Sequence, residues 1–278
     1  MKILLLNESR QSIGGGWSFM DNLAKGLTKA GHHVVYDIQE CDVCLIPSAS
    51  MIHSRDTFAR ARKLSKKLFL RVDNILKNSR NRNSGMSRMY DFAQHSDMVI
   101  YQSKWAQRLL SPYLKSKGVV VYNGVDTTVF NEKGVRIDLK GSPVYLYSRF
   151  NREDSKRWYY AWYRYQELQR EQPKAVLVVV GKFSPENIKY NFDFFNGENY
   201  LYLGIVGSKT EMAKIYRSCD YLFACYEFDC YSNTYLEALA CGCKLFEPSM
   251  TGGTPELIKN GVRSIEQMTQ DYLGVFNG

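Results

Sequence analysis

The chain has 278 residues, of which 45% are hydrophobic and 23% are charged, and its net charge is +9. These values are ordinary for a folded protein and exclude intrinsic disorder as the main state. No apolar run reaches the roughly 18 residues that a membrane-spanning helix requires. The opening apolar run at residues 1–6 is followed at once by polar residues, which predicts a buried strand rather than a secretion signal and favours a cytosolic protein.

The first half of the chain alternates between short apolar runs and amphipathic stretches. Runs typical of buried strands occur at residues 2–7, 34–38, 43–46, 68–72, 97–101 and 118–122. Apolar residues recur at helical spacing in residues 17–30 and 57–68, and Gly31 is placed to end the first of these helices. This alternation predicts a doubly wound, mostly parallel sheet.

A second alternation follows the polar segment 131–143, which has the composition of an interdomain linker. Strands are expected at residues 144–147, 175–180, 201–203, 221–225 and 244–247, and helices at 158–170, 209–217 and 234–240. The sequence therefore predicts an α/β protein of two Rossmann-like domains, residues 1–135 and 136–278. We expect the two domains to face a cleft that binds ligands at the carboxyl ends of the strands.

Seven cysteines lie within or beside apolar runs, and Cys41 and Cys44 have the spacing of zinc ligands. A second matching pair does not follow nearby, and a disulfide framework is not expected in an intracellular chain of this size. Buried thiols that act as small hydrophobic side chains are the preferred interpretation. We therefore expect no metal site.

The positive charge is concentrated in one segment. Residues 55–108 hold thirteen Lys and Arg against four Asp, so this fifth of the chain carries an excess equal to the whole net charge. A solvated helix face would account for it. A surface that attracts a polyanion, either nucleic acid or anionic lipid, is the alternative.

The polar stretch from Asp229 to Glu237 follows a predicted strand and opens a predicted helix. Backbone N–H groups at such a helix start suit an anion such as a diphosphate, and each carboxylate can accept from a pair of hydroxyl groups. The spacing alone is equally compatible with a capped helix that carries a solvated glutamate.

Three motifs change this interpretation. One set of residues closely resembles the donor-site signature of retaining GT-B glycosyltransferases of the glycosyltransferase 4 family. It consists of the acid at 229, Glu-Ala-Leu-Ala-Cys-Gly at 237–242 and Thr-Gly-Gly-Thr-Pro-Glu at 251–256. The glycines at 14–16 resemble that family's amino-terminal glycine loop, and Tyr-Asn-Gly-Val-Asp at 122–126 resembles the end of its first domain. The resemblance covers most of the chain. It implies the GT-B fold and transfer of a sugar from a nucleotide-diphosphate donor with retention of configuration, without a cofactor or metal.

Carried over position by position, the resemblance implies a donor site in the second domain. Glu237 would bind the ribose hydroxyls of the nucleotide-sugar, and Asp229 would hold hydroxyls of the transferred sugar where the family usually has Glu. The loop between them would donate backbone N–H groups to sugar and phosphate. It comprises Cys230, Tyr231, Ser232, Asn233 and Thr234.

The resemblance also implies a pair of cations that stabilise the diphosphate leaving group. Arg149 and Lys156 are the candidates, with Arg152 as a substitute, although the pair is more widely spaced than in the family's common pattern. The glycine loop would let the backbone approach the diphosphate or the acceptor closely. Its residues are Gly14, Gly15 and Gly16.

The acceptor side is less well marked. The family often places a His after the fourth strand of its first domain, whereas here Pro47–Ser50 occupies that place and His53 follows a few positions later. Asp73 is a candidate for contacting or deprotonating the acceptor hydroxyl, with a turn-forming Asp as the alternative. Because only a short segment follows Glu256, we expect the family's long carboxy-terminal helical return onto the first domain to be cut short.

The sequence thus predicts a metal-independent hexosyltransferase whose acceptor is anionic, to match the basic segment. The acceptor would be a surface glycan or lipid precursor, or a hydroxymethylated base in DNA. A cytoplasmic protein, peripheral at a membrane or on DNA, is expected. The competing hypothesis is a degenerate GT-B module that binds nucleic acid or a nucleotide without turnover, for which the replacement of Glu by Asp229 leaves room.

Overall fold

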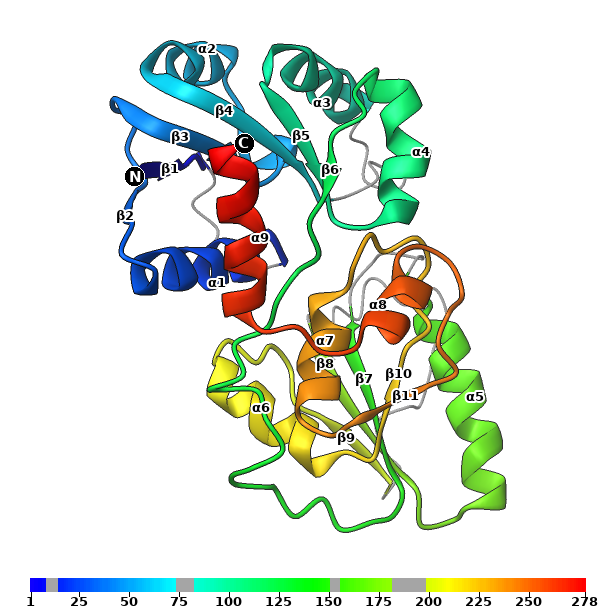
Figure 1. Cartoon of the computed structure of the whole chain (residues 1–278). Coiled ribbons are helices and arrows are strands. Elements are labelled where there is room, and N and C mark those ends of the chain that lie inside the picture. The colour runs from blue at the N-terminus through cyan, green and yellow to red at the C-terminus, as the bar shows by residue number, and fades with distance from the viewer. Residues whose placement is uncertain (9–14, 74–82, 151–155, 182–198) are drawn as a thin grey trace. The chain divides into compact units, whose positions relative to one another are not determined.

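In a computed structural model of the chain, the structure describes residues 1–8, 15–73, 83–150, 156–181 and 199–278. By its internal contacts the chain forms two compact units, each with a parallel sheet and helices (Figure 1). Unit 1 comprises Met1–Val125, Asp229–Asn233 and Gly252–Gly278, and unit 2 comprises Asp126–Phe228 and Thr234–Thr251. The predicted α/β class is confirmed.

Unit 1 contains a six-stranded sheet in the order β2-β1-β3-β4-β5-β6, and every described pair of strands is parallel. The strands are β1 (Lys2–Leu5), β2 (His33–Val35), β3 (Cys41–Ile46), β4 (Ser65–Val72), β5 (Met98–Tyr101) and β6 (Val119–Val120). The expected helix over 57–68 ends at Leu64 and is followed at once by β4, whose residues from Leu68 to Val72 are all buried, as in a strand covered on both faces.

The helices of unit 1 cover both faces of this sheet (Figure 1). They are α1 (Gly15–Lys29), η1 (Ala49–Met51), α2 (Arg55–Leu64), α3 (Asn83–His95), α4 (Lys104–Leu114) and α9 (Ile265–Asn277). The short helix α8 (Thr254–Asn260) also belongs to unit 1 but contributes no residue to the apolar clusters on the two faces. Leu4 and Cys44 belong to the apolar cluster that includes α2, α3 and α4, whereas Ile3 and Leu45 belong to the one that includes α1 and α9. Successive strand residues therefore face opposite layers, as a doubly covered sheet requires.

Unit 2 contains a five-stranded parallel sheet in the order β11-β10-β7-β8-β9. The strands are β7 (Val144–Phe150), β8 (Val176–Gly181), β9 (Tyr200–Tyr202), β10 (Tyr221–Phe223) and β11 (Lys244–Phe246), with helices α5 (Trp158–Glu171), α6 (Lys209–Ser218) and α7 (Asn233–Ala240). Tyr145 on the central strand contacts the rings of Tyr165, Tyr221 and Phe246. These aromatic rings pack together around the central strand of unit 2.

The two units differ from the predicted division at residue 135 in two respects. The first unit ends at Val125, and the carboxy-terminal segment from Gly252 returns to it instead of staying with the second unit. The return is made by α9, whose Ile265, Met268 and Tyr272 join the apolar cluster of α1. The helical return was expected to be cut short, but α9, a helix of 13 residues, makes it within the segment after Glu256.

Two further expectations concern membranes and thiols. Within the described ranges, no helix is both long and apolar enough to cross a bilayer.

All seven cysteines are buried and none is part of a disulfide. Cys41 and Cys44 lie on β3, where burial raises the pKa of both thiols. They act as small hydrophobic side chains of the core, as predicted.

The close approach of α1 and α9 depends on Gly26. A Cβ atom at this position would lie 1.9 Å from Thr269 Oγ1 and 3.0 Å from Thr269 Cβ. We predict that Gly26→Ala forces the helices apart and costs about 1–3 kcal/mol, which lowers Tm by about 5 °C.

Gly274 on α9 supplies the matched control, because a Cβ there meets nothing within 4 Å. Gly274→Ala should be neutral or slightly stabilising, since Ala is the better helix former. Thr269→Ala in the Gly26→Ala background should recover part of the loss. Equal melting temperatures for the two single variants would contradict this packing.

Candidate functional site

Arg149 lies at the carboxyl end of β7 in an unusual backbone conformation. Its φ is 65°, and the ladder between β7 and β8 is irregular because two residues, Ser148 and Arg149, stand between the paired positions where β8 has only Val180. Such a bulge bends the strand and re-aims a side chain, and a left-handed arginine costs conformational free energy. The strain is typical of a functional position at the carboxyl edge of a parallel sheet.

Two of the predicted cations lie near one aromatic ring. Lys156 Nζ lies 4.7 Å from the centroid of the Tyr226 ring, and Arg149 Cζ lies 6.0 Å from it. Tyr226 is fully buried, stacks on Tyr235 and donates its hydroxyl to the Ser148 carbonyl. The ring therefore occupies a fixed position between sheet and helix. Lys156 is itself 5% exposed, and Arg152 lies outside the described residues.

Glu237 belongs to the same group of unit 2. It lies on α7, where Tyr216 donates its hydroxyl to the carboxylate at 3.4 Å. Burial raises the pKa of Glu237 to about 7, against the opposing effect of the positive charges of Lys209 and Arg149. The structure thus links Glu237 electrostatically to Arg149. Lys209 was not predicted as a site residue, because its only signal in the sequence is its position next to the helix-capping Ser208.

The loop Asp229–Asn233 is grouped with unit 1, and the glycine pair 252–253 explains part of this. Gly252 has a φ of 69°, and a Cβ there would lie 2.3 Å from the Asp229 carbonyl oxygen. A Cβ at Gly253 would lie 1.9 Å from the Cys230 carbonyl oxygen, and the Gly253 N–H donates to the Asp229 carbonyl at 2.8 Å. The glycine motif is therefore required for the close approach of two backbone segments.

Asn123 holds the other end of this loop. Its Nδ2 donates to the Tyr231 carbonyl at 3.0 Å and to Asn233 Oδ1 at 2.9 Å. Asn233 in turn donates to the carbonyl of Gly15 at 3.2 Å, which connects the loop to the start of α1. The Asn-Gly-Val-Asp motif is thus part of the support for the loop, a role that the sequence analysis did not assign.

The loop side chains are mostly buried rather than exposed to solvent. Cys230, Tyr231, Ser232 and Thr234 are each less than 9% exposed. Ser232 Oγ has no hydrogen-bond partner within the described part of the chain. A buried hydroxyl without a partner is costly, so a ligand that supplies one would be favoured there.

On the acceptor side, Asp73 follows β4 and lies near the start of α1. A Cβ at Gly16 would lie 3.9 Å from Asp73 Oδ2, so the carboxylate is close to the glycine segment. Of that predicted loop, Gly15 and Gly16 begin α1, and Gly14 lies outside the described residues. The structure therefore brings Asp73 together with two of the three predicted glycines.

The expected place of the family's histidine needs correction. Pro47–Ser50 follows β3, the third strand in chain order, whereas Asp73 is the residue that follows the fourth. His53 is exposed, and its backbone N–H donates to the carboxylate of Glu8. Hydrogen bonds from Thr57, His53 and Ser54 outweigh desolvation and lower the pKa of Glu8. Glu8, which follows β1, was not singled out from the sequence.

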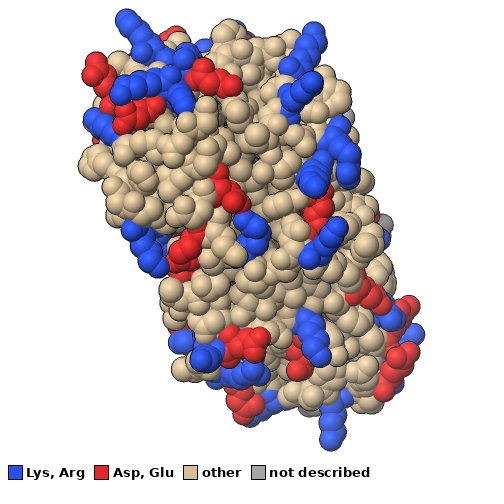
Figure 2. All heavy atoms as spheres, in the orientation of Figure 1, with Lys and Arg blue, Asp and Glu red and all other residues tan. Residues whose placement is uncertain are grey.

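The basic segment 55–108 does not form a uniform surface. Arg71 is 2% exposed and buried in unit 1, and Lys77, Arg80 and Arg82 lie outside the described residues. Arg55, Arg62 and Lys66 form ion pairs with Asp91, Asp97 and Asp42. Figure 2 shows Lys and Arg interspersed with Asp and Glu over the visible face. The exposed cations outside those pairs include Arg60, Lys63, Lys104 and Arg108.

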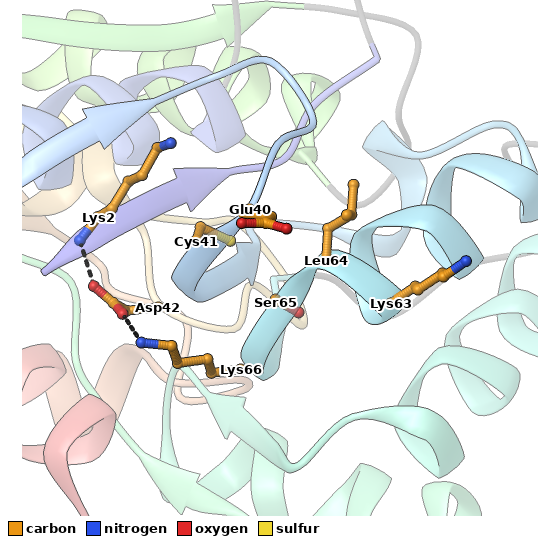
Figure 3. Close-up of a pocket in the computed structure, with 8 residues that line it drawn as sticks. All are labelled: Lys2, Glu40, Cys41, Asp42, Lys63, Leu64, Ser65 and Lys66. Carbon is orange, nitrogen blue, oxygen red and sulfur yellow. Dashed lines mark hydrogen bonds and ion pairs between the residues drawn. The ribbon is translucent and has the colours of Figure 1, made fainter.

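A cavity of about 400 Å³ in unit 1 lies away from the predicted residues (Figure 3). It is lined by residues at the amino-terminal ends of β1, β3 and β4, among them Lys2, Cys41 and Ser65. Asp42 bridges its rim by accepting from the Lys2 backbone N–H and from Lys66 Nζ. Because ligands of open α/β sheets bind at the carboxyl ends of strands, this cavity is not the predicted site.

Residues 144–271 match the family model described as glycosyl transferases group 1, a segment that holds Arg149, Lys156 and Glu237. This segment, slightly less than half of the chain, is therefore similar to the glycosyl transferases group 1. The search of curated proteins found no match.

Solved structures show the GT-B fold. Anabaena HepE in complex with UDP is 15% identical with a TM-score of 0.67, and the match covers 100% of this chain and 89% of that one. Starch synthase IV from Arabidopsis thaliana, bound to ADP and acarbose, is 12% identical with a TM-score of 0.66 and coverage of 99% and 91%. An α-glucosyltransferase in complex with UDP and a 13-mer DNA containing an HMU base is 14% identical, with a TM-score of 0.60 and coverage of 100% and 90%. The predicted GT-B fold is confirmed.

The raised pKa of Glu237 predicts that the ligand-free protein loses folding stability as the pH rises. The carboxyl titrates near pH 7 in the folded chain, against a reference value of 4.5 for the unfolded one. Between these values the folded state keeps a proton that the unfolded state releases, so the contribution of this group to stability falls as pH rises through that window. Above pH 7 the free energy of unfolding stays lower by a constant amount, because the carboxyl is then ionised in both the folded and the unfolded state.

We therefore predict that Glu237→Gln melts at the same temperature as the wild type near pH 4 and about 5 °C higher above pH 7. Thermal unfolding across pH 4–8.5 measures the difference. Glu171→Gln at the exposed end of α5 is the control and should leave the pH profile unchanged. A difference that does not vary with pH would show that Glu237 is not held at a raised pKa.

Proposed function

We propose that this protein is a retaining glycosyltransferase that moves a hexose from a nucleotide-diphosphate sugar to an acceptor hydroxyl without a metal ion. The observation that carries the proposal is the group in unit 2 in which Arg149 interacts with both the Tyr226 ring beside Lys156 and the carboxylate of Glu237. Two cations and one carboxylate at the carboxyl edge of a sheet match the chemistry of a nucleoside diphosphate. The matched glycosyltransferase domain supports the same conclusion.

The proposed roles follow from charge and hydrogen-bonding capacity. The Glu237 carboxylate accepts from the ribose hydroxyl pair, and Arg149 and Lys156 neutralise the diphosphate. Asp229 accepts from hydroxyls of the transferred sugar, and the loop from Cys230 to Thr234 offers backbone N–H groups to sugar and phosphate. Arg152 and the glycine loop are additional contacts in this proposal.

The reaction breaks the bond between the anomeric carbon and the diphosphate oxygen, and the electron pair leaves with the phosphate. The acceptor oxygen attaches on the same face, and its proton passes to the departing phosphate. Negative charge therefore grows on the leaving group in the transition state, where preorganised cations stabilise it most. Asp73 is proposed to orient the acceptor hydroxyl or to assist its deprotonation.

The acceptor is proposed to be anionic, because the chain has a net charge of +9 and exposed cations on unit 1. A surface glycan or lipid precursor and a hydroxymethylated base in DNA both satisfy this requirement. The DNA-bound α-glucosyltransferase of the same fold supports including the second.

The donor site is tested by thermal-shift and turnover measurements with UDP-, GDP-, ADP- and TDP-sugars, with and without magnesium. We predict a metal-independent rise in the melting temperature with one nucleotide and slow hydrolysis of that donor. Arg149→Met and Lys156→Met should lower kcat by about 10²- to 10³-fold, whereas Lys214→Met, a surface cation paired with Glu211, should not.

Glu237→Ala should abolish donor binding with the fold retained, and an unchanged rate would contradict the assignment. Binding of a nucleotide-sugar without any hydrolysis or transfer would instead support a non-catalytic GT-B module.

The acceptor class is tested by salt. If the acceptor is duplex DNA with hydroxymethylated bases, transfer to it should fall by about 10³-fold or more between 50 and 200 mM salt, provided that roughly 6–10 phosphates are contacted. The control is donor hydrolysis under the same conditions, which should change little. Transfer that is independent of salt would exclude the DNA version, and parallel reactions with anionic lipid vesicles would then test a membrane-surface acceptor.

A further inference from the structure

Arg71 on β4 is a buried cation whose partners are neutral groups. It is 2% exposed, and its guanidinium donates to the carbonyl of Pro47 and to Asn123 Oδ1, each at 3.0 Å. Its Cζ lies 3.6 Å from the centroid of the Phe19 ring on α1. Arg71 therefore joins the segment after β3, the helix α1 and the segment after β6.

This arrangement is unfavourable for stability alone. Within the described ranges no ion pair of Arg71 with a carboxylate is found, and its Nε has no hydrogen-bond partner. A charge taken out of water without a counter-ion costs more than a methionine of similar volume at the same place. The hydrogen bonds of the guanidinium must therefore have a role that an apolar side chain could not fill.

The hydrogen bonds of Asn123 indicate this role of the Arg71 guanidinium. Since Arg71 occupies Oδ1 of this side chain, the carboxamide is oriented with Nδ2 toward Gln102 Oε1, the Tyr231 carbonyl and Asn233 Oδ1. Gln102 in turn donates to the Val72 carbonyl, next to Asp73. The hydrogen bonds thus run from the buried cation to the loop 229–233 and to the end of β4.

We infer that Arg71 is a positioning residue, which acts through Asn123 to set the backbone of the loop 229–233 for the sugar donor. The inference rests on the proposed function, because the loop matters for catalysis only if it binds that donor. It assigns no direct contact between Arg71 and substrate. The planar fork of arginine can donate to two acceptors while its face stacks on Phe19, whereas the compact ammonium of lysine cannot reproduce this geometry.

The experiment compares Arg71→Lys, Asn123→Ala and the double variant. Donor KM, kcat and the hydrogen-exchange rates of the amides in 229–233 are measured for each. Arg217→Lys is the matched control, because Arg217 is also buried and donates to three carbonyls, those of Val129, Asn131 and Val135, all of which belong to unit 2 rather than unit 1.

We expect Arg71→Lys and Asn123→Ala each to raise donor KM by about tenfold and to speed exchange in the loop, with the double variant no worse than Asn123→Ala. Arg217→Lys should lower the melting temperature without raising KM. If the two substitutions raise KM independently, so that their effects multiply in the double variant, Arg71 does not act through Asn123 and the inference is wrong. It is also wrong if Arg71→Lys changes neither KM nor hydrogen exchange in the loop.

Failure of the proposed function gives a different pattern. In that case the wild type binds no nucleotide-sugar in any state. Hydrogen exchange still tests whether Arg71 positions the loop, because faster exchange of the loop amides in Arg71→Lys can be measured without a donor. If the wild type binds its donor and Arg71→Lys binds it equally well, the inference about Arg71 fails and the glycosyltransferase assignment remains.

Discussion

The carboxamide of Asn123 connects segments that lie far apart in the sequence. It accepts from Arg71 on β4 and donates to the main chain and side chain of the loop at Tyr231 and Asn233. Together with the close approach of Gly252 and Gly253 to Asp229 and Cys230, these bonds assign the loop to unit 1, while the helix continues from Thr234 into unit 2. The conformation of the loop is therefore a property of unit 1, although its sequence neighbours belong to unit 2.

In unit 2 three unfavourable features occur in one group. Arg149 has a left-handed backbone, Lys156 is buried, and the carboxyl of Glu237 has a pKa near 7. Each costs free energy in the ligand-free chain, and a structural role would be filled better by apolar or solvated residues. Strain and perturbed ionisation in one place are typical of a functional site.

Charge in unit 1 serves more than one purpose. The segment with the largest positive excess contributes exposed cations, ion pairs across the surface and, in Arg71, a cation in the interior. A count of charges in the sequence treats these as equal. Their effects differ, because a paired surface charge adds little to the external field, whereas a buried one acts through the geometry of its hydrogen bonds.

The sequence alone determined the α/β class, most of the strands and the motifs around Asp229, Glu237 and Gly252–Gly253, because apolar runs and glycine constraints are local properties. It did not reveal the return of α9 to unit 1, the role of Asn123, or the contribution of Lys209 and Tyr226. These depend on contacts between residues more than 20 positions apart, such as Gly26 with Thr269 and Asn123 with Tyr231. Which side chains share an environment, and hence which carboxyl holds its proton near pH 7, is decided only when the chain has folded.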